Sequence, residues 1–331
     1  MTAAHGTAGT FKIAGEEVIR PGFGARCLTG LGVWASPQTV SGRPQWHCSS
    51  TTGRPRPTHS LKKAPQAMLL PFTEAGQGRP VVLLHARPTD RTMWDAHLPM
   101  LAEAGMRAIA LDLPGHSDAI VPDHHEVAPW SDVLDTLDRL GVDRFVLAGN
   151  SLGALVALQT AVTAPERVEG LVLVGYRPHD QPASSRLDAA WEAERTALAV
   201  GDLAAAVKAG VEAWTSAGAT EEVRTHAARM LRRRLTEQLA YGDPPQAADP
   251  LGTGPAALRT LRGMPALVSV GDHDMPDFHE GAEGLASVLD AGRTAVIPDA
   301  GHLAPLEQPA AFCTMLLDFV RRLPQRSSPA H

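Results

Sequence analysis

The sequence predicts an α/β protein with a doubly wound, mostly parallel sheet and a helical cap inserted into it. From Arg79 onward, short apolar runs alternate with longer helical patterns, as in chains that wind helices around a parallel sheet. This alternation stops for about 90 residues after Val174, and a stretch of that length is expected to hold structure of its own. A third observation is the sequence Gly149-Asn150-Ser151-Leu152-Gly153, which lies directly between an apolar run and a helical pattern.

Six short apolar runs are interpreted as the strands of the sheet. Each is bounded by Gly, Pro or charged residues, and an unbroken apolar run is what a strand buried on both faces requires. Helical patterns separate them and cover the sheet. The predicted strands are Val81 to Leu84, Ala108 to Leu111, Phe145 to Ala148, Leu171 to Val174, Leu267 to Val270 and Ala295 to Ile297, and the predicted helices are Asp95 to Ala104, Trp130 to Leu140, Leu152 to Ala164, Phe278 to Leu289 and Pro309 to Leu323.

The insert is interpreted as a cap of three helices over one end of the sheet, at Ser185 to Val200, Leu203 to Ala217 and Glu221 to Tyr241. The predicted core then comprises residues 66–175 and 264–325, and the cap comprises residues 176–263. Trp191 and Trp214 lie in the cap and either line a pocket or attach the cap to the core. The run Arg232-Arg233-Arg234 is interpreted as part of a solvated helix face.

Residues 1–65 are predicted to be a disordered basic extension. They contain nine Gly, six Pro, eight Lys or Arg and two Glu, so their net charge is +6 in a chain whose total is -6. The sequence Arg54-Pro55-Arg56-Pro57 leaves a partner-binding arm open as an alternative. Met68 precedes the patterned sequence directly and is a candidate for the natural start of translation.

Composition excludes several classes of protein. Of the residues, 44% are hydrophobic and 20% charged, and no apolar run approaches the roughly 20 residues that cross a bilayer, so neither a disordered chain nor a membrane protein is expected. No signal-peptide pattern opens the chain. A net charge of -6 gives no general attraction to nucleic acid. Cys27, Cys48 and Cys313 are far apart, which favours neither disulfides nor zinc and indicates a reducing cytoplasm.

Ser151 is the candidate nucleophile. A serine between two glycines, at a sharp turn from strand to helix, is lifted above the edge of the sheet, and the helix N-terminus supplies free N–H groups where negative charge would develop. A serine hydroxyl needs a base, and the base needs an orienting acid. His302 and Gly271-Asp272-His273-Asp274 follow two later strands and are expected at the same carboxyl edge.

Residues 68 to 323 resemble the α/β-hydrolase fold superfamily, in particular its small esterases and enol-lactonases. The matching stretches are His85-Ala86-Arg87 with Trp94, Asp112-Leu113-Pro114-Gly115-His116-Ser117, Gly149 to Gly153, Gly271 to Asp274 and Gly301-His302-Leu303. The order Ser, Asp, His along the chain is also that of the superfamily. The resemblance implies a triad of Ser151, Asp274 and His302, with Asp272 and Asp180 as the alternative acids.

The resemblance also implies an oxyanion hole made by the backbone N–H groups of Arg87 and Leu152. This chain departs from the usual His-Gly pattern by having Ala86 after His85, and alanine tolerates fewer backbone conformations than glycine. Arg87 and Arg177 follow predicted strands at the carboxyl edge and, with Trp191 and Trp214, are the candidate substrate-binding residues.

These expectations describe a serine hydrolase, without cofactor or metal, that cleaves a small-molecule ester or lactone through an acyl-enzyme. A cofactor-free haloperoxidase or a hydrolase of carbon–carbon bonds would use the same triad. A non-catalytic ligand-binding homologue is the alternative from another class. The sequence predicts neither the individual substrate nor the oligomeric state.

Overall fold

A computed structural model describes residues 10–13, 16–19, 68–122, 125–252 and 254–324, and the chain divides into two units, residues 1–48 and 49–331. In the first unit, β1 (Thr10–Ile13) and β2 (Glu16–Ile19) form a two-stranded antiparallel sheet. The rest of residues 1–65 lies outside the described residues, so the disordered extension stays a prediction there. The same holds for the Arg54 to Pro57 stretch.

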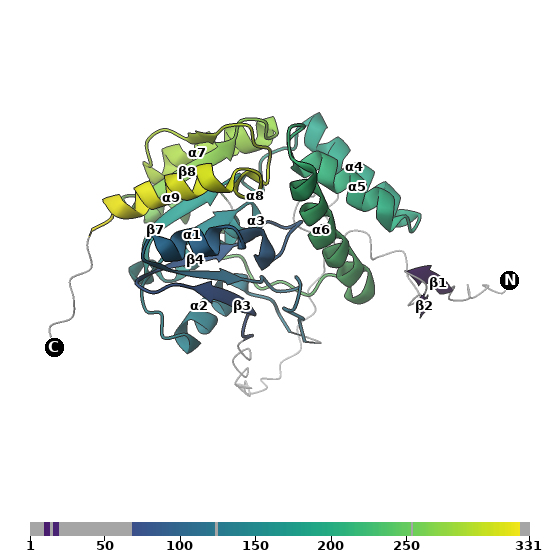
Figure 1. The fold of residues 1–331 in the computed structure, drawn as a ribbon, viewed down its shortest axis with the longest axis horizontal. Helices are drawn as coiled ribbons and strands as arrows, with labels where there is room; N and C mark the ends of the chain where they lie inside the picture. The colour runs from purple at the N-terminus through teal and green to yellow at the C-terminus, as the bar shows by residue number, and fades with distance from the viewer. Residues whose placement is uncertain (1–9, 14–15, 20–67, 123–124, 253, 325–331) are drawn as a thin grey trace, which may run out of the picture. The chain divides into compact units, whose positions relative to one another are not determined.

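The second unit is built on a seven-stranded sheet in the order β3-β5-β4-β6-β7-β8-β9 (Figure 1). All neighbouring strands are parallel except β3, which runs antiparallel to β5 at one edge. The strands are β3 (Phe72–Ala75), β4 (Arg79–Leu84), β5 (Met106–Leu111), β6 (Phe145–Asn150), β7 (Val168–Val174), β8 (Ala266–Gly271) and β9 (Ala295–Ile297). The predicted doubly wound α/β fold is confirmed.

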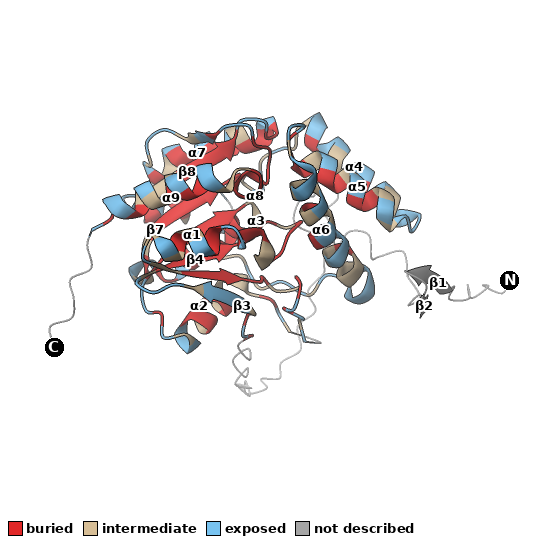
Figure 2. Cartoon of the chain, viewed as in Figure 1, coloured by how far each residue is buried: buried red, intermediate tan, exposed pale blue. Residues whose placement is uncertain are grey.

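Helices cover the sheet. Every residue of β6 is buried, and since successive side chains of a strand point to opposite faces, both faces of this strand are covered. Among them, α1 packs against α9, and α2 packs against α3. Figure 2 shows the buried residues concentrated in the strands and on the inner sides of these helices. The helices are α1 (His97–Glu103), α2 (Pro129–Arg139), α3 (Leu152–Thr163), α7 (Pro276–Leu289), α8 (Ala304–Glu307) and α9 (Pro309–Arg322), with short 3-10 helices at Arg91–Trp94, Pro165–Arg167 and Leu258–Leu261.

The predicted cap is present as three helices between β7 and β8, namely α4 (Ser185–Ala199), α5 (Leu203–Trp214) and α6 (Glu221–Tyr241). Ser184, Asp202 and Thr220 cap them by accepting a hydrogen bond from a backbone N–H three residues later. The helices pack in sequence, α4 on α5 and α5 on α6. Figure 1 shows them together at one end of the sheet.

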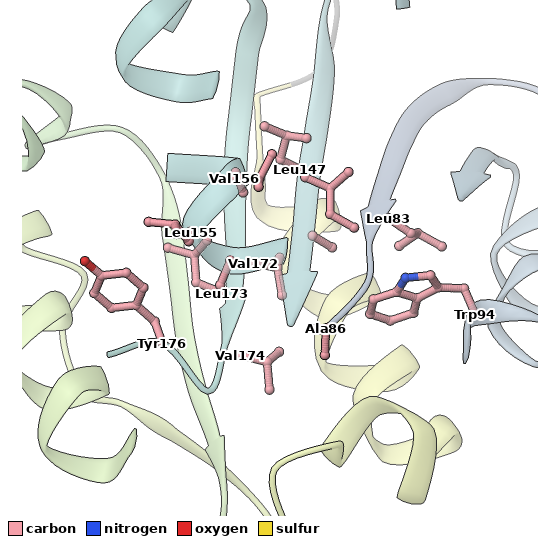
Figure 3. Packing of buried hydrophobic residues seen from close by; sticks show 14 of the residues in the cluster. Leu83, Ala86, Trp94, Leu147, Leu155, Val156, Val172, Leu173, Val174 and Tyr176 are labelled. Atoms are coloured by element: carbon pink, nitrogen blue, oxygen red, sulfur yellow. The ribbon is translucent and has the colours of Figure 1, made fainter. Parts of the chain in front are cut away.

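One hydrophobic core joins these elements, from Met68 at one end of the described segment to Leu323 near the other. Figure 3 shows part of it, with Leu83, Leu147 and Val172 coming from the adjacent strands β4, β6 and β7. The backbone N–H of Met68 donates to Asp132 Oδ1 at 3.3 Å. Met68, where the patterned sequence begins, is thus already joined to the core of the described residues.

No described helix is long and apolar enough to span a membrane.

Deleting residues 1–65 is expected to change Tm by less than about 2 °C and to leave kcat/KM unchanged, because the sequence of that segment contains no recognisable core element. Differential scanning calorimetry and an ester assay on the two proteins test this. A matched deletion of residues 1–71 should lower Tm by several degrees, since it also removes the buried side chain of Leu70 and the bond from its N–H to Thr136 Oγ1 (2.9 Å). A large loss of stability on the shorter deletion would contradict the prediction.

Candidate active site

Ser151 lies at the sharp turn between β6 and α3, with φ 55° and ψ -110°. A positive φ is strained for a residue with a side chain, and its cost is of the order of 1–3 kcal/mol. Two glycines make the turn possible. A Cβ on Gly149 would lie 2.2 Å from the Gly153 carbonyl oxygen, and a Cβ on Gly153 would lie 2.1 Å from that of Leu84. Only glycine fits these two positions.

His302 and Asp274 are brought together from the loops after β9 and β8. His302 Nδ1 lies 2.9 Å from Asp274 Oδ2, and both side chains are buried. Asp274 Oδ1 accepts a second bond from the N–H of Met275 at 2.7 Å, which fixes the carboxylate plane. With Nδ1 donating to Asp274, Nε2 is the nitrogen left to accept a proton.

The two alternative acids do not contact His302. Asp272 is exposed, and its Oδ1 accepts from the N–H of Ala300 at 3.0 Å. Asp180 is also exposed. The geometry thus favours Asp274 as the partner of the histidine, which is the acid that the resemblance implies.

Three side chains hold His302, and the sequence analysis assigned none of them to this role. The rings of Phe278 and His302 have centroids 4.0 Å apart, and Trp214 packs on the histidine at 5.1 Å. Asn150 Nδ2 donates to the His302 carbonyl oxygen at 3.1 Å. Of these, Trp214 was a candidate for substrate binding, whereas Asn150 and Phe278 were missed. The only signal in the sequence is their position: Asn150 directly precedes Ser151, and Phe278 follows Asp274 by four residues.

The loop after β4, which carries the predicted oxyanion donor Arg87, is braced by two buried histidines. His85 accepts from the N–H of Leu113 through Nε2 at 2.9 Å and donates from Nδ1 to the Ala86 carbonyl oxygen at 2.8 Å. Acceptance by Nε2 requires the neutral ring, and burial lowers the pKa of His85 accordingly. His116 Nε2 lies 3.1 Å from the Arg87 carbonyl oxygen. The loop is therefore ordered although Ala86 replaces the usual glycine.

The Arg87 guanidinium is paired with the cap. Its Nη2 lies 3.0 Å from Glu194 Oε1 on α4, and the Glu194 side chain is 10% exposed. Arg177 is held elsewhere, donating to the Gln181 carbonyl oxygen and lying over the Trp191 ring at 5.8 Å. Burial lowers the pKa of Arg177. The two arginines that were candidates for substrate binding thus each have a partner from the protein.

One group of side chains in the described segments has the spacing of metal ligands. The ligand atoms of Asp272, His273 and Asp299 lie within 4.8 Å of one another, but all three residues are exposed. Exposed acidic groups of this kind are common without a metal, so the cluster carries no argument for one.

Comparison with known proteins gives one family. Residues 81–314 match the model of the alpha/beta hydrolase family, and they include Ser151, Asp274 and His302. A thermophilic esterase from Thermogutta terrifontis superposes with a TM-score of 0.61 at 28% identity, covering 76% of this chain and 93% of that one. The enol-lactonase from Burkholderia xenovorans LB400 has the same TM-score at 23% identity, covering 76% and 96%, which shows a shared fold only.

Part of the chain is also similar to a curated hydrolase. The 2-hydroxy-6-oxo-6-phenylhexa-2,4-dienoate hydrolase of Comamonas testosteroni is 34% identical over 113 residues, which are 32% of this chain and 40% of that protein. The chain covers less than two thirds of the length of this relative and of two other curated relatives.

Asp274→Asn is expected to lower kcat by about 10,000-fold, because an amide in place of the carboxylate favours the wrong histidine tautomer. Asp272→Asn is the matched control, two residues away and exposed, and should retain kcat within about threefold. Steady-state kinetics on a p-nitrophenyl ester measure both, and circular dichroism checks the fold. A larger loss in the control than in Asp274→Asn would assign the acid to Asp272.

Proposed function

Because the chain belongs to the α/β-hydrolase family, we propose that it is a serine hydrolase cleaving small-molecule esters or lactones with a triad of Ser151, His302 and Asp274. The observation that carries the proposal is the buried 2.9 Å contact between His302 Nδ1 and Asp274 Oδ2, in a fold whose nucleophile turn holds Ser151 at φ 55°. Nucleophilic catalysis by a serine needs a base to activate the hydroxyl and a third group to orient that base.

In the acylation step, Ser151 Oγ attacks the carbonyl carbon while His302 Nε2 takes the hydroxyl proton. Asp274 stabilises the resulting imidazolium. The negative charge that develops on the carbonyl oxygen is stabilised by the backbone N–H groups of Leu152 and Arg87. When the tetrahedral intermediate collapses, the bond to the leaving alkoxide breaks and His302 returns the proton to that oxygen.

In the deacylation step, His302 takes a proton from water and the hydroxide attacks the acyl carbon. The bond to Ser151 Oγ breaks, the serine recovers the proton, and the carboxylic acid leaves. For a lactone the alcohol and the acid are ends of one product. No redox step occurs, so the cycle balances with substrate and water alone.

Cleavage of a carbon–carbon bond is the second candidate. The similarity to the Comamonas hydrolase favours it, since the two sequences are 34% identical over 113 residues. It would use the same histidine and serine, with a carbanion rather than an alkoxide leaving. A panel of p-nitrophenyl esters, aliphatic lactones and vinylogous 1,5-diketones separates the two activities.

Ser151→Ala is expected to fold with a Tm within a few degrees of the parent and to lose both hydrolysis and covalent labelling by a fluorophosphonate. The alanine removes the nucleophile while leaving Gly149, Gly153 and their close contacts in place. Intact-protein mass spectrometry measures the labelling. Labelling that persists in the variant would place the reactive serine elsewhere.

The parent is expected to prefer neutral substrates over anionic ones, because Glu194 neutralises Arg87. Glu194→Gln releases the guanidinium and should raise kcat/KM for a dicarboxylic acid monoester about 5- to 10-fold relative to its methyl-capped analogue. Glu192→Gln is the matched control, since Glu192 is exposed on the same helix and pairs with Arg195. An unchanged ratio in Glu194→Gln would show that Arg87 does not face the acyl group.

A further inference from the structure

Glu307 ends the short helix α8 and lies five residues after His302, with 9% of its surface exposed. Both of its carboxylate oxygens accept backbone N–H groups. Oε1 accepts from Gly301 at 3.0 Å, and Oε2 accepts from Ser216 at 2.8 Å. Gly301 precedes the catalytic histidine, whereas Ser216 lies in the turn between the cap helices α5 and α6. One side chain therefore joins the histidine loop to the cap.

Two further contacts tighten this connection. The N–H of Leu303 donates to the Trp214 carbonyl oxygen at 3.1 Å. A Cβ on Gly301 would lie 2.6 Å from the nitrogen of Ser216, so the two backbones touch where only glycine fits. We call these five residues, Trp214, Ser216, Gly301, Leu303 and Glu307, the loop–cap junction.

A carboxylate is the side chain that this geometry requires. Glu307 makes no ion pair within the part of the chain that the structure describes, and its charge is stabilised by the two N–H donors. An amide of the same shape has one acceptor oxygen, and its NH₂ group would face the second N–H. Replacing the carboxylate thus leaves one buried donor unsatisfied and pushes the two backbones apart.

The loop–cap junction acts on the ring of His302 from two sides. Gly301 and Leu303 hold the backbone on either side of the histidine. Trp214 contributes its carbonyl oxygen to the junction and its ring to the packing on His302, at 5.1 Å between centroids. A displacement of the junction would therefore move the histidine relative to Asp274 and Ser151 together.

We propose that Glu307 is a positioning residue for the histidine: it holds the backbone at Gly301 against the cap and thereby keeps His302 Nδ1 on Asp274 and Nε2 toward Ser151. The inference rests on the proposed function, because it takes His302 to be the general base. On this proposal, the cap turn at Ser216 helps to hold the general base in place.

Glu307→Gln tests the proposal. We expect kcat to fall about 10- to 100-fold with KM changed by less than about threefold, since a misplacement of about 1 Å can cost 100-fold in rate. The rate of fluorophosphonate labelling should fall in parallel. Hydrogen exchange, followed by mass spectrometry, should become at least tenfold faster in peptides containing Ser216 and Gly301, and remain as in the parent over β4 and β6.

Glu169→Gln is the matched control for lost stability. Glu169 is a comparably buried glutamate at the start of β7, and its Oε2 lies 3.1 Å from Arg79 Nε. It lies at the amino-terminal ends of the strands, whereas His302 lies beyond the carboxyl-terminal ends. This substitution should lower Tm and leave kcat unchanged. All kinetics are measured at least 15 °C below the lowest Tm, so that both variants are folded.

The outcomes separate the two proposals. Parent-like kcat in Glu307→Gln, or unchanged exchange at both peptides, overturns the positioning role. If the parent itself neither hydrolyses esters or lactones nor reacts with the fluorophosphonate, the proposed function fails. The downfield proton resonance of His302 Nδ1–H then supplies the readout: its loss or shift in Glu307→Gln supports the positioning role, and an unchanged resonance overturns it.

Discussion

The strained backbone at Ser151 is the constraint around which the rest of the site is arranged. A non-glycine residue at φ 55° persists only where its surroundings hold it, and here the sheet does so. The N–H of Ser151 donates to the Val174 carbonyl oxygen at 2.8 Å, and the N–H of Gly175 donates to that of Ser269 at 2.9 Å. The hydrogen bonds between β6, β7 and β8 thus continue one residue beyond the strands, to Ser151 and Gly175. Gly175 lies against the ring of His302, where a Cβ would come within 3.2 Å of it.

The sequence was sufficient for the features that depend on local pattern, and insufficient for those that depend on exposure or on distant neighbours. The buried parallel strands and the three cap helices were predicted because their residues are apolar in runs or at helical spacing. Strand β3 was missed because three of its four residues are exposed and it runs antiparallel at an edge, where no apolar run is needed. Ser151 and His302 were singled out by their motifs and Asp274 by the resemblance, whereas Glu307 had no motif and is recognised only by its two backbone donors.

The arginine run on α6 shows the same limit. The prediction of a solvated face is wrong for Arg234, whose side chain is 13% exposed and whose Nε lies 3.3 Å from His116 Nε2. Burial, followed by the charge of Arg87, lowers the pKa of Arg234. Its neighbour Arg233 does lie at the surface and pairs with Asp118 at 2.7 Å. Adjacent residues on a helix point about 100° apart, so Arg233 can lie at the surface while Arg234 contacts the core beneath α6.

The order of the site residues along the chain also matters for synthesis. Ser151 is translated long before Asp274 and His302, and the cap helices α4 to α6 lie between them. Domains are synthesised at roughly 5–20 residues per second, so several seconds separate Ser151 from Asp274 and His302. Strands β8 and β9 can join the sheet only after the cap has left the ribosome, because they follow it in the chain. A nascent chain therefore carries Ser151 before Asp274 and His302 have been made, and the proposed triad can form only late in synthesis.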